Sequence, residues 1–179
     1  MHFHPARLFI IAAVFALGAC ASSRSLDESF SDMSANAELK AVLFADRSHD
    51  YNDIDLTLYE GRLMLTGTMR SEEGRRKLIA NAWKADGVDE VIDEIIIADK
   101  TSMGQGFEDA RIDKTLRARL IADGDVSSGD YKMSVSRAIV YLLGSARSQK
   151  ELDAAVQQAR SVSGVEKVVS HVAIRNPAM

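Results

Sequence analysis

The sequence has few of the groups on which catalysis usually depends. It contains one cysteine, Cys20, and 4 histidines in 179 residues, and only His49 and His171 follow that cysteine. A single cysteine leaves no disulfide partner in an exported chain, and acyl-transfer chemistry needs a nucleophile with a base beside it. The composition therefore favours a protein that binds over one that catalyses, and we expect no enzyme activity.

An excess of positive charge and a metal-binding pattern are also missing. The chain has 22 Lys and Arg residues against 26 Asp and Glu residues. This balance argues against a nucleic-acid partner, because duplex affinity rests on cations that neutralise phosphates. Acidic residues gather between Asp46 and Asp55 and again at Asp123, Asp125 and Asp130, but neither group follows the alternating ligand spacing of a calcium loop. We expect no metal and no other cofactor.

The apolar stretch near the start of the chain is too short to cross a bilayer, which takes about 20 residues. It runs from Leu8 to Leu17, follows the basic Arg7, and is typical of a secretory signal. The tetrapeptide Leu17-Gly18-Ala19-Cys20 ends this stretch and resembles the lipobox of bacterial lipoproteins. An ordinary signal peptide that ends near a cysteine is the alternative.

The lipobox resemblance implies that residues 1–19 are removed as a signal peptide and that Cys20 is acylated with diacylglycerol and a further chain such as palmitate. Residues 20–30 are then a lipidated tether, and several acyl chains anchor stably where one chain gives only marginal binding. The next residue is Ala21, whereas an aspartate there commonly means retention in the inner membrane of proteobacteria. The resemblance therefore implies a protein of the outer membrane that faces the periplasm.

The remaining residues contain an internal repeat in one constant register. Gly67 aligns with Gly144, and the same register aligns Gly87-Val88 with Gly164-Val165. A single register over most of the chain indicates a tandem duplication.

Each copy predicts the same order of elements. Apolar residues at helical spacing predict an opening helix over 34–46 in the first copy and over 109–123 in the second. An alternating hairpin, a second helix with a serine as its N-cap, and a final strand over 91–97 or 168–174 complete each copy. We predict an α+β fold of two tandem domains, each a helix-strand-strand-helix-strand two-layer sandwich with a three-stranded sheet.

The hairpin end and the last strand of each copy carry a shared pattern. It consists of Leu65 to Gly67, Gly87-Val88 and Val91 in the first copy, and of Leu142 to Gly144, Gly164-Val165 and Val168 in the second. Both copies resemble the BON domain, which implies domains over residues 31–98 and 107–176 with a linker over 99–106. Two copies behind a lipobox resemble the dual-BON outer-membrane lipoproteins, and this implies binding of anionic phospholipids and a role in outer-membrane integrity.

The opening helix of the second copy is the candidate lipid-binding element, because cations near an exposed apolar tip can contact headgroups. If Ile112, Leu116 and Leu120 face the core, the other side carries the lipid-binding candidates, which are Arg111, Lys114, Arg117 and Ile121, with Phe107 just before the helix. The corresponding helix of the first copy has only Lys40. A helix face that is merely solvated is the alternative.

A second set of residues is the candidate contact face for the other domain or for a protein partner. Strand alternation gives the outer face of the second sheet as Ile139, Tyr141, Leu143, Val169 and His171. Trp83 joins this set because its repeat counterpart is Arg160. The rival function is therefore a lipid-tethered protein-interaction module for outer-membrane assembly or envelope-stress factors.

Overall fold

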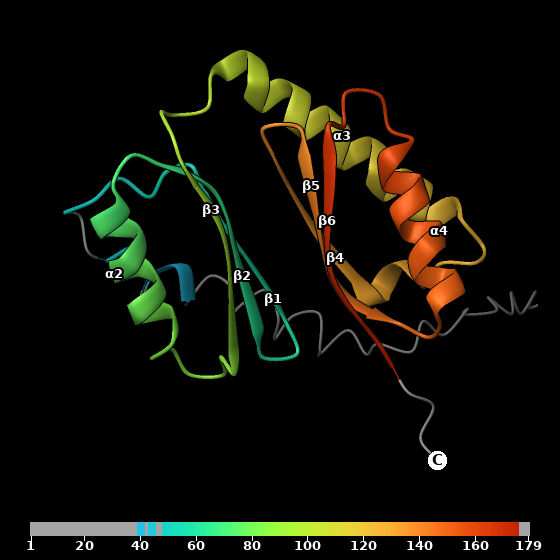
Figure 1. The fold of residues 1–179 in the computed structure, drawn as a ribbon, viewed down its shortest axis with the longest axis horizontal. Helices are drawn as coiled ribbons and strands as arrows, with labels where there is room; N and C mark the ends of the chain where they lie inside the picture. The colour runs from blue at the N-terminus through green and yellow to red at the C-terminus, as the bar shows by residue number, and fades with distance from the viewer. Residues whose placement is uncertain (1–38, 42, 46–47, 176–179) are drawn as a thin grey trace, which may run out of the picture.

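The computed structural model describes residues 39–41, 43–45 and 48–175 (Figure 1). The predicted signal peptide, the lipidation site Cys20 and the tether lie outside the described residues. Within the described part of the chain, no helix combines the length and the apolar character that a membrane span requires.

The first domain is a three-stranded sheet covered on one face by a helix (Figure 1). Its elements are β1 (Ile54–Tyr59), β2 (Arg62–Met69), α2 (Glu72–Ala82) and β3 (Glu90–Ile97). The central strand β2 pairs antiparallel with β1 and parallel with β3. Leu39 to Ala41 and Leu43, within the expected opening helix, are helical.

The second domain repeats this arrangement with a longer first helix (Figure 1). Its elements are α3 (Met103–Ala122), the short 3₁₀ turn η1 (Ser128–Asp130), β4 (Tyr131–Ser136), β5 (Ile139–Ala146), α4 (Gln149–Arg160) and β6 (Lys167–Ile174). Strand β5 is central and pairs antiparallel with β4 and parallel with β6. The predicted α+β class, with a three-stranded sheet in each domain, is confirmed.

Serine hydroxyls start the helices that follow each hairpin. The Ser71 Oγ accepts a hydrogen bond from the Gly74 N–H at 3.0 Å, and the Ser148 Oγ accepts one from the Glu151 N–H at 3.2 Å. These bonds satisfy backbone donors that have no partner inside the helix. A third serine, Ser102, does the same for α3, so this helix begins at Met103 and not at residue 109 as we expected. Its first turn therefore lies inside the predicted linker.

The glycine that ends each hairpin is required by a close backbone approach. A Cβ on Gly67 would lie 1.9 Å from the Asp53 carbonyl oxygen, and a Cβ on Gly144 would lie 2.1 Å from that of Asp130. Both glycines also have positive φ angles, which residues with a Cβ atom rarely adopt. The shared sequence pattern thus has a steric cause.

The β4–β5 turn contains Arg137 and Ala138, which are poor residues for a tight turn. Both have positive φ angles, of 53° and 62°. The carboxylate of Asp109 on α3 accepts hydrogen bonds from the backbone N–H groups of Arg137 and Ala138, each at 2.9 Å. Because Asp109 is itself buried, this contact both supports the turn and fixes α3 against the sheet.

The two sheets face each other, with the helices on the outside (Figure 1). Each domain has its own core between sheet and helices, including Leu63, Leu65 and Leu78 in the first and Ile112, Leu116, Leu120 and Leu142 in the second. A third buried cluster lies between the sheets and contains residues of both domains. The sheet faces that the helices leave open are therefore closed by each other.

Candidate functional site

One side of α3 carries large apolar side chains that are exposed to solvent. Met103 is 84% exposed, Phe107 76% and Ile121 68%. At about 100° per residue, these three residues and Lys114 fall on the side opposite the buried Ile112. We call this side of α3 the exposed stripe: Met103, Phe107, Lys114, Arg117 and Ile121. Apolar residues lie at both of its ends and cations lie between them.

The three cations predicted on this helix differ in their partners. The Arg111 guanidinium pairs with Glu108 at 2.9 Å and also donates to the Ser163 carbonyl at 2.7 Å, so it ties α3 to the loop before β6. Arg117 pairs with Asp113 at 3.1 Å, one turn away on the same helix. Lys114 has no ion-pair or hydrogen-bond partner within the described residues. It is the cation of this group that is most available to a ligand.

Met103 extends the exposed stripe beyond the residues that sequence reasoning selected. It was missed because the helix was expected to start at residue 109. Ser102 is the sequence signal that could have predicted the earlier helix start, because serine is a preferred N-cap residue. Its hydroxyl accepts a hydrogen bond from the Gln105 N–H at 3.2 Å. With Met103 one turn before Phe107, the start of α3 presents two adjacent apolar side chains.

The predicted outer face of the second sheet lies against the first domain. Tyr141 and Leu143 are buried in one cluster with Tyr59, Met64 and Ile92 of the first domain. Ile139 and Val169 pack against this cluster and are partly buried. The apolar residues of this face therefore form an interface within the chain.

Hydroxyl groups make further contacts across this interface. The Tyr59 and Ser145 hydroxyls lie 2.7 Å apart, and so do those of Thr66 and Ser134. All four side chains are buried, so each hydrogen bond satisfies polar groups that would otherwise be costly to bury. The hydrogen bonds fix how the two sheets are aligned.

His171 pairs with Glu94 at the edge of the interface. The His171 Nε2 lies 2.8 Å from the Glu94 Oε1, and both side chains are partly buried. These two residues occupy the same position in the two repeats, because the register that aligns Gly67 with Gly144 also aligns Glu94 with His171. Arg62 adds a second link, donating to the His171 carbonyl at 2.8 Å.

Trp83 lies outside this interface. Helix α2 lies on the side of the first sheet that faces away from the second domain (Figure 1). Trp83 is the C-cap residue of this helix and is 54% exposed. The structure therefore leaves Trp83 as a candidate for contact with a separate partner.

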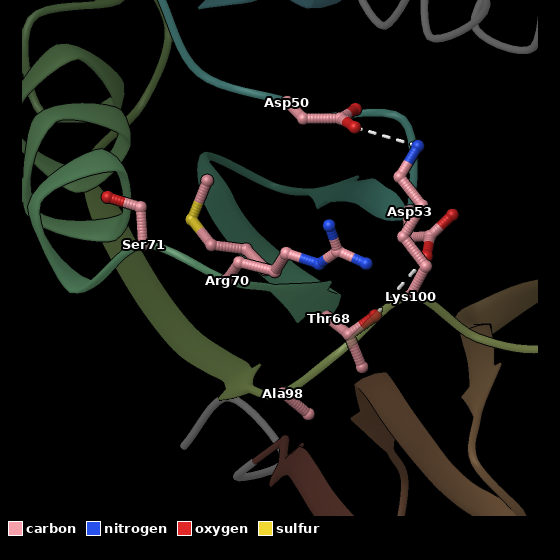
Figure 2. A pocket seen from close by; sticks show the side chains of 8 residues that line it. Asp50, Asp53, Thr68, Arg70, Ser71, Ala98 and Lys100 are labelled. Atoms are coloured by element: carbon pink, nitrogen blue, oxygen red, sulfur yellow. Dashed lines mark hydrogen bonds and ion pairs between the residues drawn. The ribbon is translucent and has the colours of Figure 1, made fainter.

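The acidic residues before β1 hold the segment between the domains. The Lys100 ammonium pairs with Asp50 at 2.7 Å (Figure 2). The Asp53 carboxylate accepts a hydrogen bond from the Thr101 N–H at 2.9 Å. The hydrogen bond from Lys100 lowers the pKa of Asp50. The small cavity beside them has a volume of about 50 Å³, far below the several hundred Å³ of a typical ligand pocket. In the described residues, no group of three or more potential ligands is placed to hold a metal ion.

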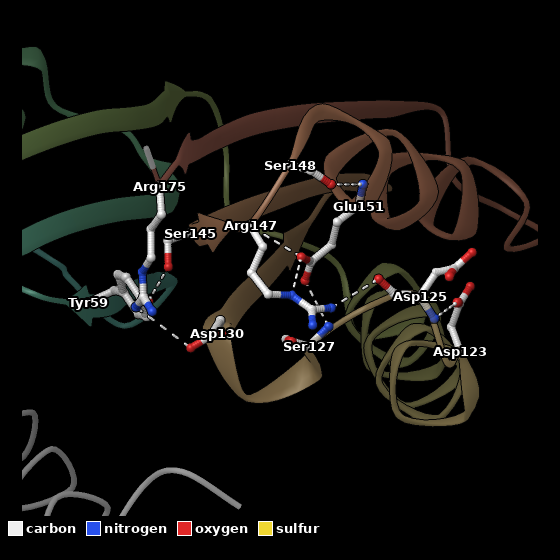
Figure 3. A network of polar contacts seen from close by, with 10 residues as sticks. All are labelled: Tyr59, Asp123, Asp125, Ser127, Asp130, Ser145, Arg147, Ser148, Glu151 and Arg175. Carbon is white, nitrogen blue, oxygen red and sulfur yellow. Dashed lines mark hydrogen bonds and ion pairs between the residues drawn. The ribbon is translucent and has the colours of Figure 1, made fainter. Parts of the chain in front are cut away.

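A buried carboxylate organises the corresponding loop of the second domain (Figure 3). Glu151 accepts hydrogen bonds from the Ser127 N–H at 2.8 Å and from the Arg147 N–H at 3.0 Å, and it pairs with the Arg147 guanidinium at 2.8 Å. Burial alone would raise the pKa of Glu151, but these hydrogen bonds from Arg147 and Ser127 lower it. The arrangement is that of a structural anchor for the loop before β4.

Arg175, the residue directly after β6, links the second domain to the first (Figure 3). Its guanidinium donates to the Tyr59 hydroxyl at 3.0 Å and pairs with Glu60, also at 3.0 Å. The Tyr59 hydroxyl therefore bonds to both Ser145 and Arg175 of the second domain.

Comparison with known proteins identifies the repeat. The family model described as the BON domain matches residues 31–99 and 108–176. An "uncharacterized protein in gshII 5′ region" of Anaplasma centrale is 33% identical over 127 residues, which cover 70% of this chain and 84% of that protein. A "21 kDa hemolysin" of Actinobacillus pleuropneumoniae is 33% identical, covering 65% of this chain and 59% of that protein.

A third relative carries a cellular location in its name. The outer membrane lipoprotein DolP of Haemophilus influenzae is 29% identical over 116 residues, which cover 65% of this chain and 60% of that protein. The chain thus spans about three fifths of the length of two of these three relatives.

Proposed function

The chain belongs to the BON-domain family, and we propose that it is a non-enzymatic outer-membrane lipoprotein that binds anionic phospholipid headgroups at the periplasmic leaflet and supports outer-membrane integrity. The exposed stripe of α3 is the observation that carries the binding proposal. The similarity to an outer membrane lipoprotein and the lipobox that ends at Cys20 support the location and the anchor.

The chemistry of the exposed stripe suits a lipid surface. Phe107 and Met103 can enter the boundary between headgroups and acyl chains, while Lys114 meets phosphates, each cation near an anionic surface contributing about 1 kcal/mol. Met103 and Phe107, adjacent on one helix face and both exposed, form an apolar surface that a lipid leaflet can cover. Acylation of Cys20 would hold this helix close to the leaflet, where weak contacts become effective.

Liposome co-sedimentation tests this proposal. The Cys20→Ser chain without its signal peptide carries no lipid anchor, so any binding must come from the folded domains. We expect it to bind vesicles of phosphatidylglycerol or cardiolipin, to ignore phosphatidylcholine vesicles, and to lose binding when Phe107 and Lys114 are changed to Ser and Glu. A control pair with the same chemical changes, Trp83→Ser with Lys84→Glu on the first domain, should bind like the parent. Binding to no vesicle would contradict the proposal.

Docking on a protein is the second candidate function, and the exposure of Trp83 favours it. Tryptophan is enriched among the residues that dominate protein interfaces, and Trp83 stands on the outer face of the first domain. A protein partner of the outer membrane that binds there would be lost in Trp83→Ser and would survive Phe107→Ser. The same two variants therefore separate the two functions.

A further inference from the structure

The two domains form an open cleft beside α3, lined by both apolar and charged residues. Its volume is about 480 Å³, which falls in the range of small-molecule sites. One wall is α3 with Lys114 and Arg117, the opposite wall is the first domain with Asp55, and β4 contributes the hydroxyls of Ser134 and Ser136. Neither domain alone forms this cleft.

Both walls of the cleft carry carboxylates, and the cations in its lining, Lys114 and Arg117, both come from α3. On α3, Asp113 and Arg117 neutralise each other, and Lys114 is left without a partner within the described residues. On the first domain, the Asp55 side chain is 52% exposed; one oxygen accepts a hydrogen bond from the Ser134 hydroxyl at 3.2 Å, and the other forms an ion pair with the Lys40 ammonium at 3.3 Å. Among the described residues, the cleft thus has an unpaired cation, Lys114, on one wall and, on the other, a half-exposed carboxylate that already binds one ammonium group, that of Lys40.

The cleft also opens toward the exposed stripe. Lys114 and Arg117 belong both to the lining of the cleft and to the exposed stripe. A leaflet that covers Phe107 and Ile121 would therefore present headgroups at the mouth of the cleft.

We propose that the cleft takes one phospholipid headgroup that carries both a phosphate and a primary ammonium, as in phosphatidylethanolamine. The phosphate pairs with Lys114, and the ammonium donates to Asp55. This inference rests on the proposed binding of α3 to a leaflet and adds a preference within it. A choline headgroup has the same charges but no N–H donor for Asp55, and a second phosphate, as in cardiolipin, would meet the carboxylates of the cleft.

Vesicles with matched anionic content test the preference. The Cys20→Ser chain is added to vesicles with one fixed fraction of phosphatidylglycerol and a remainder of either phosphatidylethanolamine or phosphatidylcholine. We expect binding about fivefold tighter with phosphatidylethanolamine, the equivalent of one charge contact at the surface. Equal binding to both vesicles would overturn the cleft inference and leave the proposed function of α3 intact, whereas binding to neither would contradict both.

Two aspartate variants locate the preference. Asp55→Asn keeps the size of the side chain and removes its charge, so it should bind both vesicles with the affinity that the parent has for phosphatidylcholine mixtures. Asp153→Asn makes the same change on the exposed side of α4 and should keep the fivefold preference. A preference that persists in Asp55→Asn would arise from the vesicles themselves and would overturn the inference. Thermal unfolding of both variants, expected near that of the parent, checks that the domains remain docked.

Discussion

The two domains have one fold and share the glycine that ends each hairpin, yet they differ at positions that face outward. Gly67 and Gly144 serve the same backbone approach, whereas Trp83 in the first domain is replaced by Arg160 in the second. Lys114, on the exposed stripe, has Ala37 as its counterpart. The two domains therefore share this backbone constraint and differ on surfaces that a ligand or partner can reach.

A buried position shows that the interiors have diverged as well. Glu151 anchors the loop before β4 in the second domain, and its counterpart in the first is Gly74. A Cβ on Gly74 would lie 2.9 Å from the His49 ring, so the side chain of His49 takes the space there. The same position is therefore filled by the Glu151 carboxylate in the second domain and by the His49 ring in the first.

The largest expected loss of stability comes from replacing the glycine that ends each hairpin, and we expect it to be similar in the two domains. Gly67→Ala and Gly144→Ala each force a Cβ against a backbone carbonyl, 1.9 Å and 2.1 Å away, and should destabilise their own domain by about 3 kcal/mol or more. Trp83, the single tryptophan, reports on the first domain by fluorescence, and hydrogen exchange of β5 reports on the second. Gly87→Ala is the control, because its φ is also positive but nothing lies near the new Cβ; its cost should be about 1 kcal/mol. If one of the two substitutions cost its own domain much less than the other, the shared glycine would not have the same role in the two domains.

Glu151→Gln should destabilise the second domain by about 2 kcal/mol at neutral pH, because the charge-assisted hydrogen bonds of a buried carboxylate are lost. The pKa of Glu151 is lowered from its ordinary value of 4.5. Its contribution to stability is therefore present above that value and is lost as the pH falls through the lower pKa of the folded state. Unfolding measured between neutral and acidic pH should show a steeper loss for the parent than for Glu151→Gln. A parallel pH dependence in the two proteins would show that this carboxylate does not couple the second domain to pH.

The docking of the domains is expected to depend on Tyr59 to a smaller extent. Tyr59→Phe removes the hydroxyl that contacts Ser145 and Arg175 and leaves a buried serine without this partner, so the cost should be about 1.5 kcal/mol. Calorimetry should show the two domains unfolding less cooperatively. If the unfolding transition keeps its shape and midpoint, the apolar cluster around Met64 and Tyr141 is sufficient to hold the sheets together, and the Tyr59 hydroxyl is not required.

The sequence predicts the periodic part of this structure and misses the contacts that depend on docking. Helical spacing and strand alternation predict the secondary structure because each element has a buried and an exposed side. The partners of individual side chains are set by how the sheets align, and no local pattern encodes the pair formed by His171 and Glu94. In the same way, Asp109 was counted only as the first residue of a helix, and its support of Arg137 and Ala138 depends on residues far along the chain.

The smallest predicted effect is the difference in vesicle binding between substitutions of the individual cations of α3. Lys114→Gln should weaken binding to anionic vesicles about fivefold, because one free charge contributes about 1 kcal/mol near an anionic surface. Arg111→Gln should weaken it less, since Arg111 already bonds to Glu108 and Ser163 and must give up those contacts to reach a phosphate. Lys84→Gln on the first domain is the matched control and should bind like the parent. Co-sedimentation at several salt concentrations measures all three, with the parent and Arg111→Gln more sensitive to salt than Lys114→Gln. If Lys84→Gln weakened binding as much as Lys114→Gln, net charge would drive the association, and the division of roles between the two domains would be wrong.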